Sequence, residues 1–268
     1  MSAGQRSWDL KVRRAERHLD EVKAAMAAYA AGDPYLAVRA RQPKGQRHVW
    51  LYRLEMTEEP DLMIPVIIGD CLYDLRSALD HLAVAMAPRN RKANAAFPVE
   101  TTDPWARNAA GGFVYGDERR QSFTAKVKGM PNEAVELITK AQPYQSEGSE
   151  LETLSLISRL ENADKHRSPI TVSHGVTNAR STVTVKGETI TQGTDGFRKN
   201  GAEIAKFGFQ DRALGESEVT VKVNGTAAIA IKVPGIDGHF TMPESLEILI
   251  GWVRDSAILE LAPFTRPN

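Results

Sequence analysis

The chain has 268 residues, of which 42% are hydrophobic and 25% charged, and its 34 Lys and Arg residues are balanced by 34 Asp and Glu residues. These values exclude disordered, fibrous and low-complexity chains and leave one large or two small globular domains. The zero net charge gives no global indication of nucleic-acid binding, and the single cysteine, Cys71, excludes an intrachain disulfide. We expect a cytoplasmic protein without a membrane span, since no apolar stretch approaches about 20 residues and the charged N-terminus does not resemble a secretory signal.

Three elements are predicted in the first third of the chain. Between residues 8 and 31, apolar side chains recur at spacings of two to four among strong helix formers, which predicts a long helix. Alternation of apolar and polar residues on both sides of a turn-like segment predicts a β-hairpin at about residues 36–56. A broad apolar stripe over residues 62–87, with Pro65 in its first turn, predicts a central helix.

The region after the central helix has fewer regular patterns. Residues 89–130 carry scattered aromatic residues without a clear period, so a long irregular segment is expected. A short helix is predicted from Pro131 to Gln142 and another over about residues 150–164. Each of the two begins with a helix-start signal that is followed by apolar residues at helical spacing.

The last third of the chain is predicted to be rich in strands and to end in a helix. The clearest turn signal is Asn224-Gly225, which lies between two alternating segments and predicts a hairpin. Residues 243–261 are apolar at helical spacing, with Gly251 inside the pattern, and predict a closing helix that packs back on the body.

These patterns together predict an α+β fold, a helical bundle-like body with a predominantly antiparallel β-sheet region inserted before a C-terminal helix. The expected helical body covers residues 1–168 and includes the small hairpin. The β-rich region is expected over residues 169–240, and the C-terminal helix within residues 241–268. No repeat period is present in the sequence, which excludes a solenoid.

One face of the central helix carries a polar stripe. On a helical wheel, the residues within about 60° of one another are Asp70, Asp74, Ser77 and His81, with Asp80 beside them and Arg76 near the apolar boundary. Arg76 and Asp80 are an i,i+4 ion pair, so an ordinary solvated face is one interpretation. In the functional interpretation His81 is an imidazole that titrates near neutral pH, with Asp74, Ser77 and Asp80 as supporting residues. A metal bound by the carboxylates is a further alternative, but the spacing is no ligand signature and we expect no metal and no cofactor.

The segment Arg76-Ser77-Ala78-Leu79-Asp80-His81 resembles the Arg-x4-His signature of the HEPN superfamily. This superfamily consists of compact helical bundles, many of which are metal-independent ribonucleases that act as toxins or in defence. The resemblance implies that Arg76 holds the scissile phosphate, that His81 assists proton transfer as the 2′-hydroxyl attacks, and that two subunits form a composite cleft. The segments LRSALDHLA and NADKHR together are also similar to a group of uncharacterised bacterial and phage proteins, which implies no activity.

A second polar cluster follows the helix predicted over residues 150–164. Lys165, His166 and Arg167 lie at its C-terminal end, where the helix dipole alone accounts for positive side chains. In the functional interpretation Lys165 and Arg167 bind an anionic substrate, Asn162 orients it, and His166 is a second catalytic imidazole. Two histidines with nearby cations suit phosphodiester cleavage, because one imidazole serves as base and the other as acid while the cations stabilise charge on phosphorus.

Two functions therefore remain open from the sequence. The first is a homodimeric protein that cleaves or binds RNA without a metal, through Arg76, His81 and His166. The second is a non-enzymatic binding or interaction protein in which Arg, His and Asp residues form a structural polar network. A catalytic pair must be reachable from a positively charged cleft, whereas a structural network is buried and hydrogen-bonded.

Overall fold

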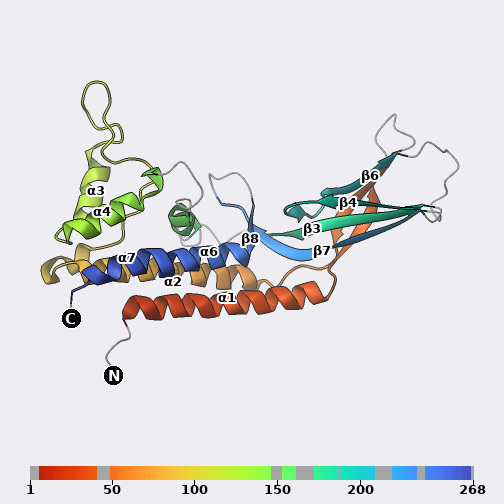
Figure 1. The fold of residues 1–268 in the computed structure, drawn as a ribbon, viewed down its shortest axis with the longest axis horizontal. Helices are drawn as coiled ribbons and strands as arrows, with labels where there is room; N and C mark the ends of the chain where they lie inside the picture. Colours follow the sequence, from red (N-terminus) through yellow and green to blue (C-terminus); the bar gives the residue numbers. More distant parts are fainter. Residues whose placement is uncertain are drawn as a thin grey trace. The chain divides into compact units, whose positions relative to one another are not determined.

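The computed structural model describes residues 6–40, 49–145, 153–160, 172–185, 188–208, 219–233 and 239–266. Its helices and antiparallel sheets form the α+β fold that the sequence predicts (Figure 1). The chain divides into two compact units. Unit 1 consists of Met1–Asp20, Val66–Ile170 and Pro243–Asn268, and unit 2 of Glu21–Pro65 and Thr171–Met242.

Unit 1 is built from helices. In chain order they are α1 Ser7–Ala31, which passes into unit 2 after Asp20, α2 Met63–Met86, the 3₁₀ helix Arg89–Asn94, α3 Asp117–Val127, α4 Asn132–Lys140, the 3₁₀ turn Pro143–Gln145, a helical segment at 153–160, α6 Glu244–Trp252, a π-helical turn Val253–Ile258, α7 Leu259–Leu261 and the 3₁₀ turn Ala262–Phe264.

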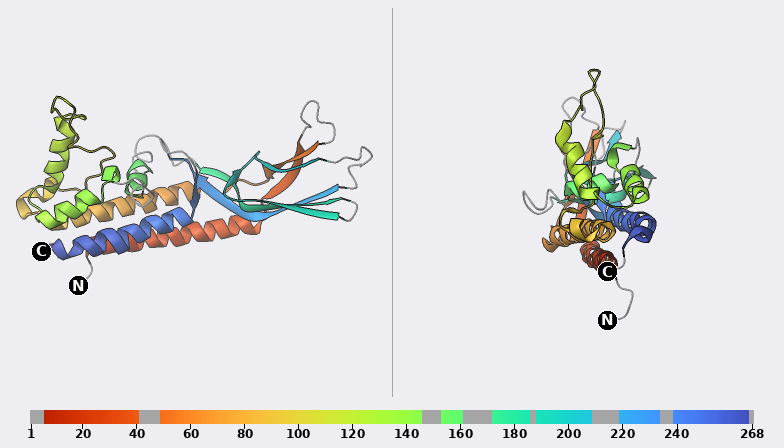
Figure 2. Two further views of the ribbon diagram at one scale, coloured as in Figure 1. Left: turned by 45° about the horizontal axis from the view of Figure 1, so that its top comes forward. Right: turned by 90° about the vertical axis from the view of Figure 1, so that its left-hand side faces the viewer.

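Figures 1 and 2 show the first part of α1, α2 and the C-terminal helix side by side. The apolar stripe of α2 forms the centre of this core, because Ile68, Leu72, Leu75 and Leu79 are fully buried. Each such side chain contributes about 1.5–3 kcal/mol relative to its exposed state.

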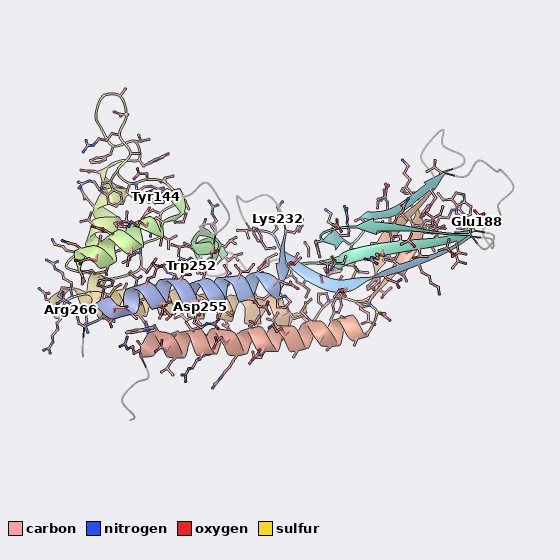
Figure 3. All side chains as sticks on the ribbon, in the orientation of Figure 1. Tyr144, Glu188, Lys232, Trp252, Asp255 and Arg266 are labelled. Carbon is pink, nitrogen blue, oxygen red and sulfur yellow. The ribbon has the colours of Figure 1, made fainter. Side chains whose placement is uncertain are left out.

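Arg266, which is labelled in Figure 3, is hydrogen-bonded to the C-terminal end of α2. The backbone N–H of Arg266 donates to the carbonyl oxygen of Ala85 at 3.0 Å, and its Nε donates to that of Met86 at 3.2 Å. These are carbonyl groups at the C-terminal end of a helix, which have no partner inside the helix itself. Arg266 therefore acts as a C-terminal cap supplied from a distant part of the chain.

The predicted helices are confirmed with small changes at their ends. The segment at 153–160 is the part of the helix expected over 150–164 that the structure describes. Inside the segment expected to be irregular, 89–130, the structure has a 3₁₀ helix and α3. α3 has only two buried residues, Phe123 and Val127, so its sequence carries almost no apolar period.

Unit 2 contains two antiparallel sheets. Its strands are β1 Tyr35–Ala40, β2 Val49–Met56, β3 Val172–Val185, β4 Glu188–Thr194, β5 Arg198–Lys199, β6 Glu203–Gly208, β7 Val219–Ile231 and β8 Phe240–Met242. The strand orders are β1-β2-β6 and β4-β3-β7-β8, with β5 paired to β3. Side chains from both sheets share one buried cluster that includes Trp50 and Leu54 of β2, Val176 and Val183 of β3, and Ile204 of β6. Unit 2 is therefore a β-sandwich.

The hairpin expected at about residues 36–56 forms from β1 and β2, but it does not belong to the helical body. β2 pairs with β6, so that Val49 lies opposite Gly208 and Trp50 opposite Phe207. The hairpin is thus part of a sheet of unit 2, which is built from two separate stretches of the chain. The alternation within a hairpin identifies a buried face but does not identify the distant strand that covers its edge.

The hairpin predicted at Asn224-Gly225 is wrong. β7 runs without a turn from Val219 to Ile231, and it pairs with β3 on both sides of Asn224. The Asn-Gly pair is a strong hairpin signal because both residues adopt positive φ easily. Here that pair lies inside a continuous strand, so a turn does not account for the glycine at position 225.

Gly225 lies opposite a bulge in β3. The pairing register shifts between Thr177 and Arg180, where Asn178 has a φ of 52°. A Cβ on Gly225 would approach the carbonyl oxygen of Thr177 at 3.1 Å. The Tyr35 hydroxyl donates to the Gly225 carbonyl at 2.6 Å and accepts from the Gly225 N–H at 3.1 Å. The glycine therefore allows a close approach inside the sandwich.

Candidate functional site

Arg76 and Asp80 of α2 form a network with the segment that follows the helix. Arg76 Nη2 donates to Asp80 Oδ1 at 3.1 Å and to the carbonyl oxygen of Phe97 at 2.8 Å. The Phe97 N–H donates to the same Asp80 oxygen at 2.9 Å. The Arg76 side chain is only 17% exposed. The predicted i,i+4 ion pair is thus confirmed, and it holds Phe97 against α2 through both backbone polar groups of that residue.

Asp74 has a different neighbour, the first part of α1. Its side chain is 3% exposed, and Lys11 Nζ lies 2.7 Å from its Oδ1. Arg14 Nε and His18 Nε2 lie 3.2 Å and 3.7 Å from its Oδ2. Residues three and four positions apart share one face of a helix, so Lys11, Arg14 and His18 approach the carboxylate together. The polar stripe of α2 is therefore divided, with Asp74 directed to α1 and Asp80 to the segment that contains Phe97.

Ser77 and His81 are both partly buried on α2. His81 Nδ1 is buried without a hydrogen-bond partner, and so is Arg76 Nη1. Among the residues that the structure describes, no hydrogen bond or ion pair joins His81 to Arg76, Asp74 or Ser77. The structure thus brings Arg76 and Asp80 together but does not connect His81 to them.

The second predicted cluster, Asn162, Lys165, His166 and Arg167, lies outside the described residues. The roles expected for these side chains stay predictions. The same applies to the approach of His166 to His81.

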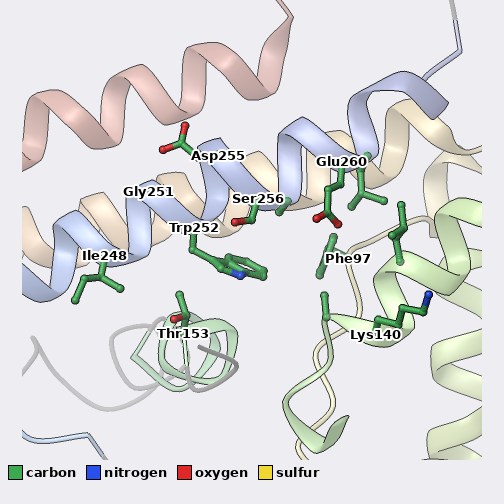
Figure 4. A pocket seen from close by; sticks show the side chains of 13 residues that line it. Phe97, Lys140, Thr153, Ile248, Gly251, Trp252, Asp255, Ser256 and Glu260 are labelled. Atoms are coloured by element: carbon green, nitrogen blue, oxygen red, sulfur yellow. The ribbon is translucent and has the colours of Figure 1, made fainter. Parts of the chain in front are cut away.

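A cavity of about 820 Å³ lies in unit 1, and α4, the helical segment at 153–160 and the C-terminal helix contribute to it (Figure 4). The described residues that line it are Phe97, Leu137, Lys140, Ala141, Thr153, Ile248, Gly251, Trp252, Asp255, Ser256, Ala257, Glu260 and Leu261. Phe97, Thr153 and Leu261 are buried, whereas Lys140 and Ile248 are exposed, so the cavity opens to solvent on one side. Its volume falls in the range of about 300–1,000 Å³ that is typical of small-molecule sites.

The wall that the C-terminal helix provides has two unusual features. A Cβ on Gly251 would meet no atom within 4 Å, so the wall is open at this position. The π-helical turn Val253–Ile258 follows almost at once and presents Ser256 and Ala257 to the cavity. Such turns occur frequently at functional sites. The sequence signal for this wall is a glycine inside an apolar helical pattern, directly before Trp252.

Three of the described lining residues are charged, and their side chains differ in their hydrogen-bond partners. The carboxylate of Asp255 accepts from Arg254 Nε at 2.8 Å and from Arg254 Nη2 at 2.7 Å, and this pairing holds the pKa of Asp255 below its usual range. Arg254 also donates to Glu16 of α1 at 2.8 Å. Figure 4 shows Asp255 turned towards α1 and Glu260 turned towards the cavity. Within the described part of the chain, Glu260 and Lys140 make no hydrogen bond or ion pair.

The described residues contain no group of three or more His, Cys, Asp or Glu side chains placed to hold a metal ion. In the same part of the chain, no helix combines the length and the apolar character that a membrane crossing requires. Comparison with known proteins found no family model, no curated protein and no solved structure that matches the chain. Its function must therefore be argued from its own residues.

Proposed function

We propose that the protein is a non-enzymatic binding protein that holds a small organic molecule in the cavity of unit 1. The observation that carries the proposal is the bonding of Arg76, whose half-buried guanidinium donates to Asp80 and to the Phe97 carbonyl. An arginine that holds a phosphate during catalysis directs its N–H groups at the substrate. The Nη2 group of Arg76 instead positions Phe97, and the Phe97 side chain forms part of the cavity wall.

The surroundings of Asp74 support the same interpretation. Its carboxylate is buried and lies 2.7 Å from the ammonium group of Lys11, so its charge is compensated inside the protein. A buried ion pair of this kind fixes the position of two helices, and its loss lowers stability. The polar residues of α2 therefore act as a structural frame on which the cavity is built.

The proposed function is tested with indole, a small flat aromatic probe, by titration calorimetry. We expect indole to bind the wild-type protein with one site per chain. Gly251→Phe should abolish binding, because the new side chain fills open space on the cavity wall, and Gly251→Ala is the matched control that keeps most of that space. Absence of indole binding, or equal binding to Gly251→Phe, would contradict the proposal.

A second candidate function is HEPN-like RNA cleavage, and one observation favours it. Arg76 Nη1 and His81 Nδ1 are buried without a hydrogen-bond partner, so a part of each side chain is not used by the structural network. Cleavage would then depend on Arg76, His81 and His166, with substrate binding by Asn162, Lys165 and Arg167. Two subunits would have to form the composite cleft.

This second candidate is tested with a mixed pool of labelled RNAs in the presence of EDTA. Wild type is compared with His81→Ala and His166→Ala, and thermal melts are recorded on the same samples. Loss of cleavage with unchanged melting, together with a dimer in analytical ultracentrifugation, supports a nuclease. No cleavage by wild type together with a lower melting temperature of His81→Ala contradicts it and agrees with a structural role for His81.

A further inference from the structure

Two aromatic side chains reach the cavity from different elements. Trp252 extends from the C-terminal helix and Phe97 from the segment after α2, and Figure 4 shows both rings in the space between the helices. Among the described side chains, neither ring is stacked on another aromatic ring. Aromatic faces attract flat ligand rings and also attract cations, so the interior of the cavity suits a ligand that combines the two.

The charged side chains of the lining indicate which ligand charge the cavity favours. The carboxylate of Asp255 accepts from Arg254, whereas that of Glu260 has no such partner among the described residues and is turned into the cavity in Figure 4. Among the described lining residues Lys140 is the one cationic side chain, and it lies exposed on α4 with its ammonium group at the end of an extended chain. The hydroxyl groups of Ser256 and Thr153 add further acceptors. The cavity thus offers a carboxylate, hydroxyls and the indole ring of Trp252 to its contents.

We infer that the ligand of this cavity is a flat aromatic molecule that carries a protonated amine. Its ring lies against Trp252, with the buried Phe97 ring behind this part of the wall, and its ammonium group donates to the Glu260 carboxylate. The open wall at Gly251 gives the ring room beside the helix. This inference rests on the proposed function, because it concerns the occupant of the same cavity.

The test compares three probes with the same ring but different charge at pH 7: tryptamine, which is a cation, indole, which is neutral, and indole-3-propionate, which is an anion. Titration calorimetry on the full chain should show that tryptamine binds about tenfold more tightly than indole, because a charge-assisted hydrogen bond to Glu260 is added. Indole-3-propionate should bind more weakly than indole.

Two variants test whether Glu260 causes the tighter binding of tryptamine than of indole. Glu260→Gln should remove the advantage of tryptamine over indole. Glu136→Gln, which alters an exposed carboxylate of α4 outside the lining, should leave it unchanged. Thermal melts of both variants establish that each is folded. Gly251→Phe should exclude all three probes while keeping the melting temperature.

The outcomes separate the inference from the function on which it rests. Indole binding with no preference for tryptamine, or with a preference that survives Glu260→Gln, overturns the inference and leaves the binding function in place. Failure of all three probes to bind overturns both. Tryptamine binding that Gly251→Phe does not affect places the amine outside the cavity and also overturns the inference.

Discussion

At the scale of single residues, a carboxylate as buried as that of Asp74 is stable only when its charge is compensated. Lys11 provides most of this compensation, because Arg14 is largely exposed and its pairing is screened by water. We expect Asp74→Ala to lower the free energy of unfolding by about 2–3 kcal/mol, less than for a fully buried pair, since Lys11 keeps 25% of its side-chain exposure. Urea unfolding measures the loss, with Asp70→Ala on the exposed side of the same helix as the control. An equal loss in both variants would contradict the role of Asp74.

Tyr35 is a second residue whose polar group stabilises the fold, through hydrogen bonds to the backbone of β7. Its hydroxyl is both donor and acceptor for the backbone of Gly225, so Tyr35→Phe leaves two backbone groups of β7 without this partner. We expect a loss of about 1–3 kcal/mol in the free energy of unfolding. Tyr115→Phe, which changes an exposed tyrosine, is the matched control for the removal of a hydroxyl. If the two variants melt alike, the Tyr35 hydroxyl is not a structural link.

Tyr29 gives unit 2 a dependence on high pH. Burial, with Glu59 and Glu58 nearby, raises the pKa of Tyr29 from 10.0 to about 12, and its hydroxyl donates to the Glu58 carbonyl at 2.9 Å. Between these two pH values the unfolded chain loses the phenol proton while the folded chain keeps it, so stability falls as pH rises. Tyr29→Phe should be less stable than wild type at pH 8, and the difference should shrink between pH 10 and pH 12. The urea midpoints of wild type and Tyr29→Phe are measured across this pH range. A constant difference between the two midpoints would contradict the raised pKa of Tyr29.

At the scale of elements, the C-terminal helix accepts a glycine in its interior where alanine would be more favourable. Glycine in a helix costs about 0.5–1 kcal/mol relative to alanine, and a Cβ on Gly251 would meet nothing within 4 Å. Gly251→Ala should therefore raise the free energy of unfolding by about this amount, as measured by thermal melts. A lower melting temperature would mean that the wall of the cavity is closed at this position.

Parts of the fold that depend on neighbouring residues can be predicted from the sequence, whereas parts that depend on distant residues cannot. α2 and the ion pair of Arg76 with Asp80 follow from spacings of three and four residues, so a periodic pattern is enough to predict them. The position of Gly225 opposite the β3 bulge depends on residues far away in the chain, and a local turn signal gives the wrong answer there. The cavity joins Phe97, Thr153 and Trp252 from three separate segments, so no spacing in the sequence indicates it.

At the scale of the whole molecule, the chain has two units that are stabilised by different contacts. The thiol of Cys71 reports on unit 1, because it is fully buried and burial raises its pKa to about 12, so labelling requires that α2 becomes exposed. Amide hydrogen exchange in β7 reports on unit 2. Both probes can be followed in the same urea series, since local and global opening are resolved residue by residue.

Asp74→Ala removes contacts only in unit 1, and Tyr35→Phe removes contacts only in unit 2. We expect Asp74→Ala to lower the urea concentration at which Cys71 is labelled and to leave the midpoint for β7 near that of wild type. Tyr35→Phe should have the opposite effect. α1 belongs to both units, so the alternative is that this helix makes the whole chain unfold as one. Equal shifts of both probes in both variants would establish that alternative, because only a single cooperative transition moves every probe by the same amount.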